Sequence, residues 1–523
     1  MARRGQVGQA VAVILLTLAA SAAGFVGIAP PQLVVGDPLP AEWSARYRVK
    51  PLPPKVVQAE TATDKPPVVA LGTVPAPVSV APPEDPLVQS LALRLQQALL
   101  AAGDVGQSGV SVMDATGRVV FDAGGTTPLI PASTAKLVTA AAVLTAFGPD
   151  HTFTTTVAAT TTPDGAGVIA GDLVLIGGGD PTLVSATYVE QRIDPDRPQT
   201  RIEGLADQLV ASGVSAVEGG VIGDPGFLQG GVLADGWPQR YLDTLDATPI
   251  AGLTIDQGLA FTLEGGRLRA RAADDPAAEA AAALTAALIS RGVTVGQPST
   301  VVEGARPGVA VELARVQSPP LMSLLTRMVQ RSDNHLADTM FRAVGRRVEG
   351  VGSFTDGAEM VRRVLVDLQL DWTTTTLQDG SGLSRSSAIP PALLTTLNYR
   401  MTNSSVGAAW QDLMAVSGVS GTLSSRLTGS IAELRLRGKT GSLQDVRALT
   451  GAVVGPDGQP LYFTVSSNAL DGPQVANARR LQDLVVLALA AELYTCTELP
   501  LPPDAPPTPP GELPPLPEHT CAR

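Results

Sequence analysis

The sequence predicts an α/β protein of the α+β kind, in which helices flank an antiparallel sheet and a large, mostly β region is inserted into the chain. A helix followed by a hairpin pattern opens the body at residues 85–121, and a strand, a hairpin and a helix close it at residues 438–493. Between residues 152 and 316 the pattern changes to short β-like runs broken by glycine clusters. These observations indicate one sheet built from both chain ends, with the insertion between them.

The N-terminal segment decides the expected compartment. Arg3 and Arg4 precede an uncharged, apolar run over residues 10–29. About 20 such residues span a bilayer as a helix, whereas the small residues 20–22 suit the cleavage site of a signal peptide. We therefore expect residues 1–29 to be either a membrane anchor or a cleaved signal. Either role places the rest of the chain outside the cytoplasm, in the cell envelope.

Two proline-rich segments flank the body. Residues 30–84 have little apolar periodicity, which predicts a disordered, extended linker, and residues 496–523 form a tail of the same character. The two cysteines of the chain, Cys496 and Cys521, both lie in this tail. They form a disulfide if the compartment is oxidising, or remain two free thiols. A body without cysteine has no cysteine-ligated metal and no thiol active site.

The body is predicted to comprise residues 85–151 and 317–495, separated by the insertion at residues 152–316. Its first helix has Asp85 as N-cap and Gly103 as the stop signal. Further elements follow from apolar spacing and turn residues. They are strands at 109–113 and 118–121, a buried helix from Pro131, helices near 319–328 and 359–368, strands at 448–454 and 461–466, and a helix at 475–493.

Lysine is rare in this chain and its placement is informative. There are five lysines among 523 residues, and only Lys136 and Lys439 lie outside the proline-rich leader. Elsewhere arginine supplies the positive charge, and arginine cannot lose its proton in a protein. Ser133 precedes Lys136 by three residues, so on a helix the two side chains share a face. This pattern indicates an amine that gives up its proton beside a hydroxyl group.

A serine hydroxyl becomes a useful nucleophile only beside a base. Histidine is a poor candidate, because the chain has only three and His519 lies in the tail; His335 is expected to pack rather than to catalyse. Lys136 can serve if its pKa falls from about 10.4 by roughly three, which costs about 4 kcal/mol. Burial, the positive end of a helix and the second cation Lys439 all lower the pKa.

A second motif, Ser332-Asp333-Asn334, precedes a helical pattern. We expect Ser332 to relay a proton to a leaving amine and Asn334 to hold a substrate amide. Asp333 is expected to be structural and to face away from substrate. The structural alternative for this motif is a helix cap at Ser332 with Asn334 on a solvated turn.

A third motif, Lys439-Thr440-Gly441-Ser442, begins a strand pattern. Lys439 and Thr440 would bind a substrate carboxylate, and Gly441 would let the strand approach the substrate closely. The backbone N–H groups of Ser133 and Ser442 are the candidates for an oxyanion hole. The alternative for Lys439 is an ordinary exposed lysine on a strand.

Together, Ser133-x-x-Lys136, Ser332-x-Asn334 and Lys439-Thr-Gly resemble the three-motif signature of penicillin-binding proteins and class A β-lactamases. Longer stretches narrow the resemblance over residues 85–495 to the class C low-molecular-mass penicillin-binding proteins. These stretches are residues 171–182, 379–385, 418–426 and 439–446. The chain departs from that pattern at Ser386 and at Asp256-Gln-Gly258, where members carry asparagine.

The resemblance implies a transpeptidase/β-lactamase-like domain and the activity of a D-alanyl-D-alanine carboxypeptidase/endopeptidase. Such an enzyme acts on peptidoglycan peptides through an acyl-enzyme on Ser133, is acylated by penicillin and other β-lactams, and needs no metal or cofactor. A net charge of −12 argues against nucleic acid as a partner. The alternatives are a β-lactamase and a non-catalytic cell-wall or penicillin-binding protein. The large insertion argues against the first, and intact Ser133, Lys136 and Lys439 argue against the second.

Overall fold

The computed structural model describes most of the body that the sequence predicts. The described residues are 69–71, 79–302, 311–349, 352–499 and 512–521. The apolar segment 10–29, with its predicted role as anchor or signal, lies outside them, as does most of the linker. Within the described part of the chain, no helix is both long and apolar enough to cross a bilayer.

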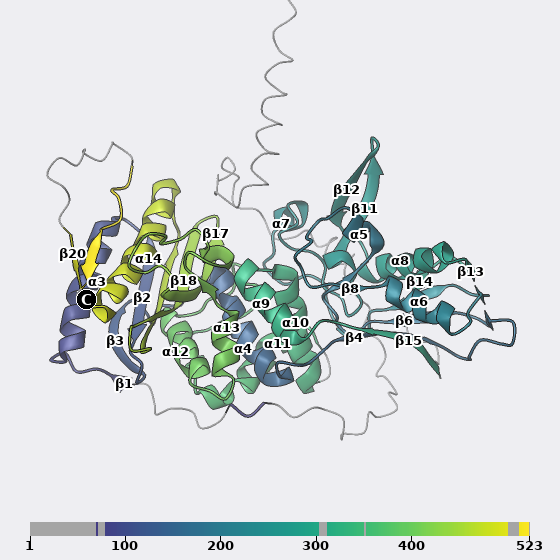
Figure 1. Ribbon diagram of the computed structural model, residues 1–523, viewed down its shortest axis with the longest axis horizontal. Helices are drawn as coiled ribbons and strands as arrows, with labels where there is room; N and C mark the ends of the chain where they lie inside the picture. The colour runs from purple at the N-terminus through teal and green to yellow at the C-terminus, as the bar shows by residue number, and fades with distance from the viewer. Residues whose placement is uncertain (1–68, 72–78, 303–310, 350–351, 500–511, 522–523) are drawn as a thin grey trace, which may run out of the picture. The chain divides into compact units, whose positions relative to one another are not determined.

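A seven-stranded sheet forms the centre of the body, in the order β1-β3-β2-β19-β18-β17-β16 (Figure 1). Neighbouring strands are antiparallel except β1 and β3. The strands are β1 (Ser79–Val80), β2 (Gln107–Met113), β3 (Arg118–Ala123), β16 (Ala415–Val416), β17 (Leu436–Leu443), β18 (Val446–Val454) and β19 (Pro460–Asn468). Because β2 pairs with β19, the two chain ends form one sheet. This confirms the predicted antiparallel sheet.

Helices cover both faces of this sheet (Figure 1). One face packs against α3 (Pro86–Ala102) and α14 (Gly472–Leu493). The opposite face carries the remaining helices of the body and the larger apolar core. These are α4 (Lys136–Phe147), α9 (Leu321–Arg331), α10 (Asn334–Glu349), α11 (Phe354–Val364), α12 (Pro391–Thr402) and α13 (Gly407–Leu413), with the short 3-10 turns η1 (Ala132–Ala135), η3 (Val366–Leu368) and η4 (Gly421–Leu423).

Local capping explains where these helices begin. The Asp85 side chain accepts the Leu87 N–H and starts α3, as predicted. Helix α14 starts at Gly472, three residues before the predicted position, because Asp471 and Gln474 cap it reciprocally. The helix predicted from Pro131 begins instead as the 3-10 turn η1, and α4 continues it from Lys136. Every residue of α4 is buried, which confirms its predicted place in the core.

The insertion between α4 and α9 has its own apolar core and a five-stranded sheet in the order β14-β10-β6-β4-β15. These strands are β4 (Thr154–Ala159), β6 (Leu173–Ile176), β10 (Val221–Asp224), β14 (Thr300–Val301) and β15 (Val311–Gln317). Smaller sheets contain β5 (Val168–Ile169), β7 (Leu183–Val184), β8 (Thr200–Arg201), β9 (Ala216–Val217), β11 (Leu259–Glu264), β12 (Arg267–Ala272) and β13 (Thr294–Val295). The insertion is thus rich in strands, as predicted.

Helices also contribute to the insertion. They are α5 (Ala186–Glu190), α6 (Glu203–Ala211), α7 (Gln239–Asp243), α8 (Pro276–Ser290) and the 3-10 turn η2 (Asp256–Gly258). Helix α8 confirms the helix-like stretch predicted at residues 273–291. Helices α6 and α8 pack against one another and against the five-stranded sheet. The alanine-rich sequence of α8 permits this close contact, because small side chains let helix and sheet approach.

The ends of the two proline-rich segments are more ordered than predicted. Ser79–Val80 pairs with Arg118 and Val119 as strand β1, and Ala81 is buried in the core beside α3. In the tail, β20 (Cys496–Glu498) pairs with β21 (His519–Cys521), and a disulfide joins the two cysteines. The predicted disorder is therefore wrong for residues 79–84 and for these strands. Backbone pairing and burial outweigh the proline content there.

Candidate active site

Ser133 lies on a tight turn held against the end of strand β17. The preceding Ala132 has a left-handed φ of 47°, which is strained for a residue with a side chain. A Cβ on Gly382 would lie 1.9 Å from the Ala132 carbonyl oxygen, and one on Gly441 would lie 2.8 Å from that of Pro131. Glycine at both positions lets two separate segments approach the turn that carries Ser133.

Strand β19, the last strand of the seven-stranded sheet in chain order, also fixes this turn. Asn468, at the end of β19, accepts the Ile130 N–H at 2.6 Å and donates its amide N–H to the Ile130 carbonyl at 3.1 Å. The two residues are 338 positions apart in the chain. The serine turn therefore depends on the C-terminal part of the body as well as on its own helix.

Lys136 occupies the centre of the site and is wholly buried. Its Nζ lies 3.1 Å from Ser133 Oγ, 2.8 Å from Asn334 Oδ1 and 2.7 Å from the Ser381 carbonyl oxygen. The structure thus brings the predicted serine and lysine of one segment together with the predicted asparagine of a second, and Ser381 belongs to a third segment. The Ser381 carbonyl is a partner that sequence reasoning missed, because a backbone oxygen has no signature in the sequence.

Burial governs the charge of Lys136. It lowers the pKa of the amine from 10.5 to about 8, against the opposing effect of the carboxylates of Asp338, Asp379 and Asp333. A substantial fraction of Lys136 is therefore neutral near pH 8. The neutral amine can accept the Ser133 proton over the observed distance.

The two buried carboxylates nearest Lys136 hold the segment that presents Ser381. Asp338 on α10 accepts the N–H groups of Gly380 and Ser381, both at 2.9 Å. Asp379 accepts the N–H of Gly382 at 2.8 Å. Burial, followed by the neighbouring Asp379, raises the pKa of Asp338 well above its ordinary value, and burial also raises the pKa of Asp379. Sequence reasoning gave neither residue a role in this site.

The second motif meets the third at Lys439. This lysine is fully buried in β17, and its Nζ donates to Ser332 Oγ at 3.0 Å and to the Thr440 carbonyl at 2.8 Å. Burial, with a smaller effect of Lys136, lowers the pKa of Lys439 well below its ordinary value. The buried position excludes the alternative of an exposed strand lysine. The site therefore contains two serine–lysine pairs.

The remaining residues of the third motif, Thr440, Gly441 and Ser442, differ in their exposure along β17. The Thr440 hydroxyl donates to Thr422 Oγ1 at 2.7 Å, so Thr422 on η4 is a further residue beside this strand. Ser442 is exposed, and Gly441 between them is buried against the serine turn. This places the Ser442 N–H one residue from the contact with the turn. The oxyanion hole expected from the Ser133 and Ser442 N–H groups stays a prediction.

The insertion contacts the site directly, although sequence reasoning identified no catalytic residue within it. Asn334 donates its amide N–H to the Asp246 carbonyl at 2.8 Å, and the Trp237 indole N–H donates to Asp379 Oδ2 at 2.8 Å. Asp333 does not bond Lys136 but pairs with Arg197 of the insertion. The insertion therefore orients residues from two of the segments that surround Lys136.

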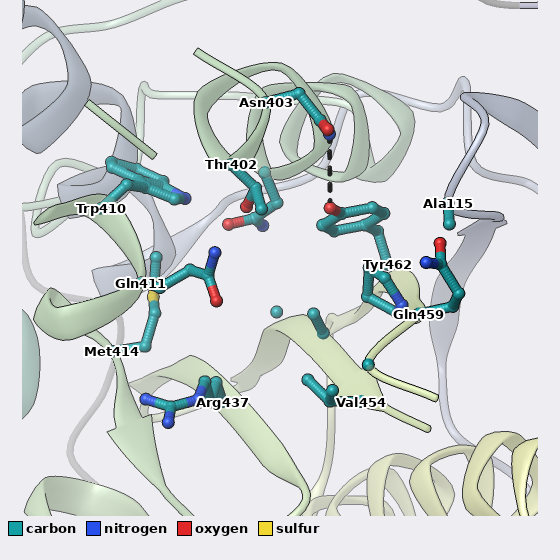
Figure 2. Close-up of a pocket in the computed structure, with 15 residues that line it drawn as sticks. Ala115, Thr402, Asn403, Trp410, Gln411, Met414, Arg437, Val454, Gln459 and Tyr462 are labelled. Carbon is teal, nitrogen blue, oxygen red and sulfur yellow. Dashed lines mark hydrogen bonds between the residues drawn. The ribbon is translucent and has the colours of Figure 1, made fainter. Parts of the chain in front are cut away.

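A cavity of about 300 Å³ lies on the same side of the sheet as α12 and α13 (Figure 2). Its lining includes Asn403, Trp410, Gln411, Arg437 and Tyr462, and Figure 2 shows the hydrogen bond between Asn403 and Tyr462. Arg437 precedes Lys439 by two residues on β17. None of the predicted site residues is among the described residues that line this cavity. The candidate active site is therefore defined by the contacts among its own residues and not by the cavity.

The chemistry that this arrangement supports is amine-assisted attack by a serine. The histidines are placed elsewhere: His151 packs against Phe147 and Phe153, with ring centroids 4.7 and 5.0 Å away. Burial lowers the pKa of His335 to about 3, which keeps it neutral at physiological pH. Lys136 is the base within reach of Ser133, and Ser332 with Lys439 forms a second hydroxyl–amine pair beside it.

Comparison with known proteins identifies the family of the chain. The profile of the D-Ala-D-Ala carboxypeptidase 3 (S13) family matches residues 87–267 and 262–489. A carboxypeptidase of Mycobacterium tuberculosis is 31% identical over 460 residues, which cover 84% of this chain and 90% of that protein. A D-alanyl-D-alanine carboxypeptidase of Actinomadura sp. strain R39 is 30% identical, over 73% of this chain and 81% of its own.

A crystal structure similar to this fold is that of penicillin-binding protein 4 from Haemophilus influenzae. It superposes with a TM-score of 0.65 at 20% identity, covering 75% of this chain and 99% of that one. The same protein in complex with a β-lactam superposes with a TM-score of 0.60. These similarities support the fold that the structure shows.

Proposed function

The chain belongs to the D-Ala-D-Ala carboxypeptidase 3 (S13) family, and we propose that Ser133 is the nucleophile of its D-Ala-D-Ala carboxypeptidase reaction. The observation that carries this proposal is the 3.1 Å contact between Ser133 Oγ and the buried Lys136 Nζ. A neutral amine at this distance is a competent general base. The substrate class is the peptidoglycan stem peptide that ends in D-Ala-D-Ala.

In the acylation step, Ser133 Oγ attacks the carbonyl carbon of the penultimate D-alanine while its proton passes to Lys136. The N–H groups of Ser133 and Ser442 stabilise the oxyanion of the tetrahedral intermediate. The peptide C–N bond then breaks, and the departing D-alanine nitrogen receives a proton through the Ser332 hydroxyl. An ester between Ser133 and the shortened peptide remains.

The residues at the edges of the site orient the substrate. Asn334 holds the peptide amide, and its side chain is already fixed between Lys136 and Asp246. Thr440 and Lys439 bind the terminal carboxylate through a hydroxyl donor and an amine donor, with Gly441 permitting close approach of the strand. The carboxylate would replace Thr422 as the partner of the Thr440 hydroxyl.

Deacylation completes the reaction. A water molecule attacks the Ser133 ester, gives one proton to the basic site, and restores the serine hydroxyl as the shortened peptide leaves. Penicillin would acylate the same serine and form the corresponding penicilloyl ester. The Haemophilus influenzae protein has a similar fold and its structure is known in complex with a β-lactam, which supports this part of the proposal.

An extracytoplasmic location follows from the substrate class, because peptidoglycan lies outside the cytoplasmic membrane. The apolar residues 10–29 would act either as an uncleaved membrane anchor or as a removable signal, and in the first case they associate with the membrane. Comparing the N-terminal residue of the mature protein with the encoded one distinguishes these two fates.

Labelling with fluorescent penicillin tests the nucleophile. The wild type is expected to form a covalent adduct, Ser133→Ala is expected to form none, and Ser290→Ala on α8 serves as a matched serine control. Equal labelling of Ser133→Ala and the wild type would exclude Ser133 as the nucleophile. A wild type that neither labels nor turns penicillin over would instead be a non-catalytic protein.

Release of D-alanine from a D-Ala-D-Ala peptide tests the reaction itself. The expected result is peptide cleavage by the wild type together with slow turnover of penicillin. Rapid penicillin turnover without peptide cleavage would identify a β-lactamase. Assays on cross-linked peptides establish the balance between carboxypeptidase and endopeptidase activity.

A further inference from the structure

Arg197, in the insertion, makes a buried ion pair with the second motif. Its side chain is fully buried, and its Nε donates to Asp333 Oδ2 at 2.8 Å. A second guanidinium nitrogen donates to the Pro181 carbonyl at 2.9 Å, and a third lies 3.5 Å from His335 Nδ1. The planar guanidinium thus joins the insertion to Asp333 of the second motif and to His335 on α10, the helix that follows.

Asp333 uses its other oxygen within the body. Oδ1 accepts the Leu336 N–H at 2.9 Å and caps the start of α10, the helix that begins with Asn334. Burial alone would raise the pKa of Asp333, but the Arg197 guanidinium outweighs it and lowers that pKa to about 2. The carboxylate is therefore charged, and its position is set by Arg197 on one side and α10 on the other.

The same loop of the insertion, residues 194–197, also contacts α9, the helix that precedes the second motif. Asp194 pairs with Arg327 in the last turns of α9, and the Arg197 backbone N–H donates to the Asp194 carbonyl at 3.2 Å. Arg327 Nε also lies 3.9 Å from Asp333 Oδ2. Residues 194–197 therefore hold both sides of the junction between α9 and α10, with Ser332 between them.

Ser332 needs such support because of its backbone conformation. Its φ of 61° and ψ of 38° are left-handed, which a residue with a side chain adopts only when its surroundings enforce it. In this conformation its Oγ lies 3.0 Å from Lys439 Nζ. A relaxed backbone would move the hydroxyl away from the amine and from the leaving nitrogen.

We propose that Arg197 is a positioning residue, through which the insertion holds Ser332 in its proton-relaying geometry. This inference rests on the proposed function, in which Ser332 delivers the proton to the leaving amine. It assigns the insertion a part in the chemical step, in addition to its contacts with Asn334 and Asp379. Arg197 itself does not touch the substrate.

The primary variant is Arg197→Met, and Arg201→Met is its matched control. Arg201 belongs to the same insertion and pairs with Glu203 through the same guanidinium nitrogen at the same 2.8 Å, but it is 45% exposed. Arg197→Met is expected to lower kcat for the D-Ala-D-Ala peptide and the penicillin acylation rate by about 10- to 100-fold, with little change in KM. Arg201→Met is expected to match the wild type.

Two further variants separate positioning from folding. Arg197→Met leaves a buried carboxylate unpaired, which can destabilise the protein; the double variant Arg197→Met/Asp333→Asn removes both charges. We expect the double variant to melt near the wild-type temperature and still to acylate slowly. Arg197→Lys, which keeps the charge, is expected to recover part of kcat.

Leu209→Ala provides a stability control, because Leu209 is fully buried in the core of the insertion. It should lower the melting temperature without changing kcat at 25 °C. A folded double variant with the kcat and acylation rate of the wild type would overturn the inference. A loss of kcat in Leu209→Ala equal to that in Arg197→Met would also overturn it. Labelling of Ser133→Ala would overturn the proposed function instead, so the two failures are distinguishable.

Discussion

At the scale of single residues, the proposed mechanism makes reactivity depend on the charge of Lys136. Burial lowers its pKa from 10.5 to about 8, and the carboxylates of Asp338, Asp379 and Asp333 keep it from falling further. The base form of Lys136 is the neutral amine, which predominates above its pKa. The fraction of competent enzyme therefore rises with pH through about 8.

We expect the rate of penicillin acylation to rise about tenfold per pH unit below pH 8 and to level off above it. Stopped-flow acylation between pH 5.5 and 10 measures this profile. Lys136→Arg, whose guanidinium stays charged throughout this range, should acylate very slowly at every pH. A wild-type rate that is flat from pH 6 to 9 would contradict Lys136 as the base.

Gly382 is expected to tolerate no side chain. Its φ of +78° is left-handed, and a Cβ would lie 1.9 Å from the Ala132 carbonyl oxygen. The conformation alone costs a residue with a side chain about 1 kcal/mol, and the overlap displaces the turn that carries Ser133. Gly382→Ala should lower both the melting temperature and penicillin acylation.

The control for this change is Gly472→Ala. A Cβ on Gly472 meets nothing within 4 Å. Thermal unfolding and acylation of this variant should stay close to those of the wild type. Wild-type acylation by Gly382→Ala would show that the turn has more room than the structure indicates.

Residue spacing predicted part of the site and missed another part. The three-residue interval between Ser133 and Lys136, together with the scarcity of lysine, indicated the central pair. The Ser381 carbonyl was not predictable, because every residue has a carbonyl and only the fold selects one. Asp338 and Trp237 were missed for a related reason: their partners lie 42 and 142 residues away. Local pattern carries no information about such distant pairing.

At the scale of elements, helix α10 connects the chemistry to the insertion. It begins with Asn334, carries Asp338 one turn later, and carries Arg342 one turn after that. Arg342 is fully buried and donates to the carbonyls of Ile250, Gln229 and Gly352. The helix therefore supplies donors to the insertion from the same face that holds the Ser381 segment.

Arg342→Met is expected to destabilise the protein by about 3 to 5 kcal/mol, because it leaves several buried carbonyl groups without a donor. Urea unfolding of the purified protein measures this loss. Arg315→Gln is the control: its pair with Glu312 is largely exposed and should contribute less than about 1 kcal/mol. Similar unfolding midpoints for the two variants would contradict the role assigned to Arg342.

The elements themselves were predictable in part, because no helix was predicted where α12 and α13 lie. Asp85, Pro86 and Gly103 predicted the limits of α3, and the turn at residues 114–117 predicted the hairpin β2–β3. The 3-10 turn at Ser133 was not predicted, because its cause is the left-handed Ala132 held by contacts with distant segments. The strand at Ser79–Val80 was missed because proline composition says nothing about an available sheet edge.

At the scale of the whole molecule, the disulfide fastens the C-terminal tail to the body. It joins residues 25 positions apart, and the tail packs on the α14 side of the sheet, where Arg480 donates to the Pro514 and Pro515 carbonyls. Ser133 and α4 lie on the opposite side of that sheet. The described tail residues, 496–499 and 512–521, therefore support the fold from the side of the sheet away from the site.

Replacing both cysteines with serine should cost at most about 3.5 kcal/mol, by loop-closure entropy. We expect a melting temperature a few degrees lower and unchanged penicillin acylation at 25 °C. A reducing agent should lower the melting temperature of the wild type but not that of the double variant. A wild-type protein insensitive to reduction would contradict the predicted contribution.

The hydrogen bonds between Ile130 and Asn468 have a consequence for the timing of biosynthesis. The turn that carries Ser133 is completed by a residue 338 positions later, on the final strand of the sheet. A chain that emerges N-terminus first therefore holds its serine in an unfinished scaffold until nearly the whole body has appeared. Nascent chains that stop before residue 468 should fail to react with penicillin, so reactivity is acquired only when synthesis is almost complete.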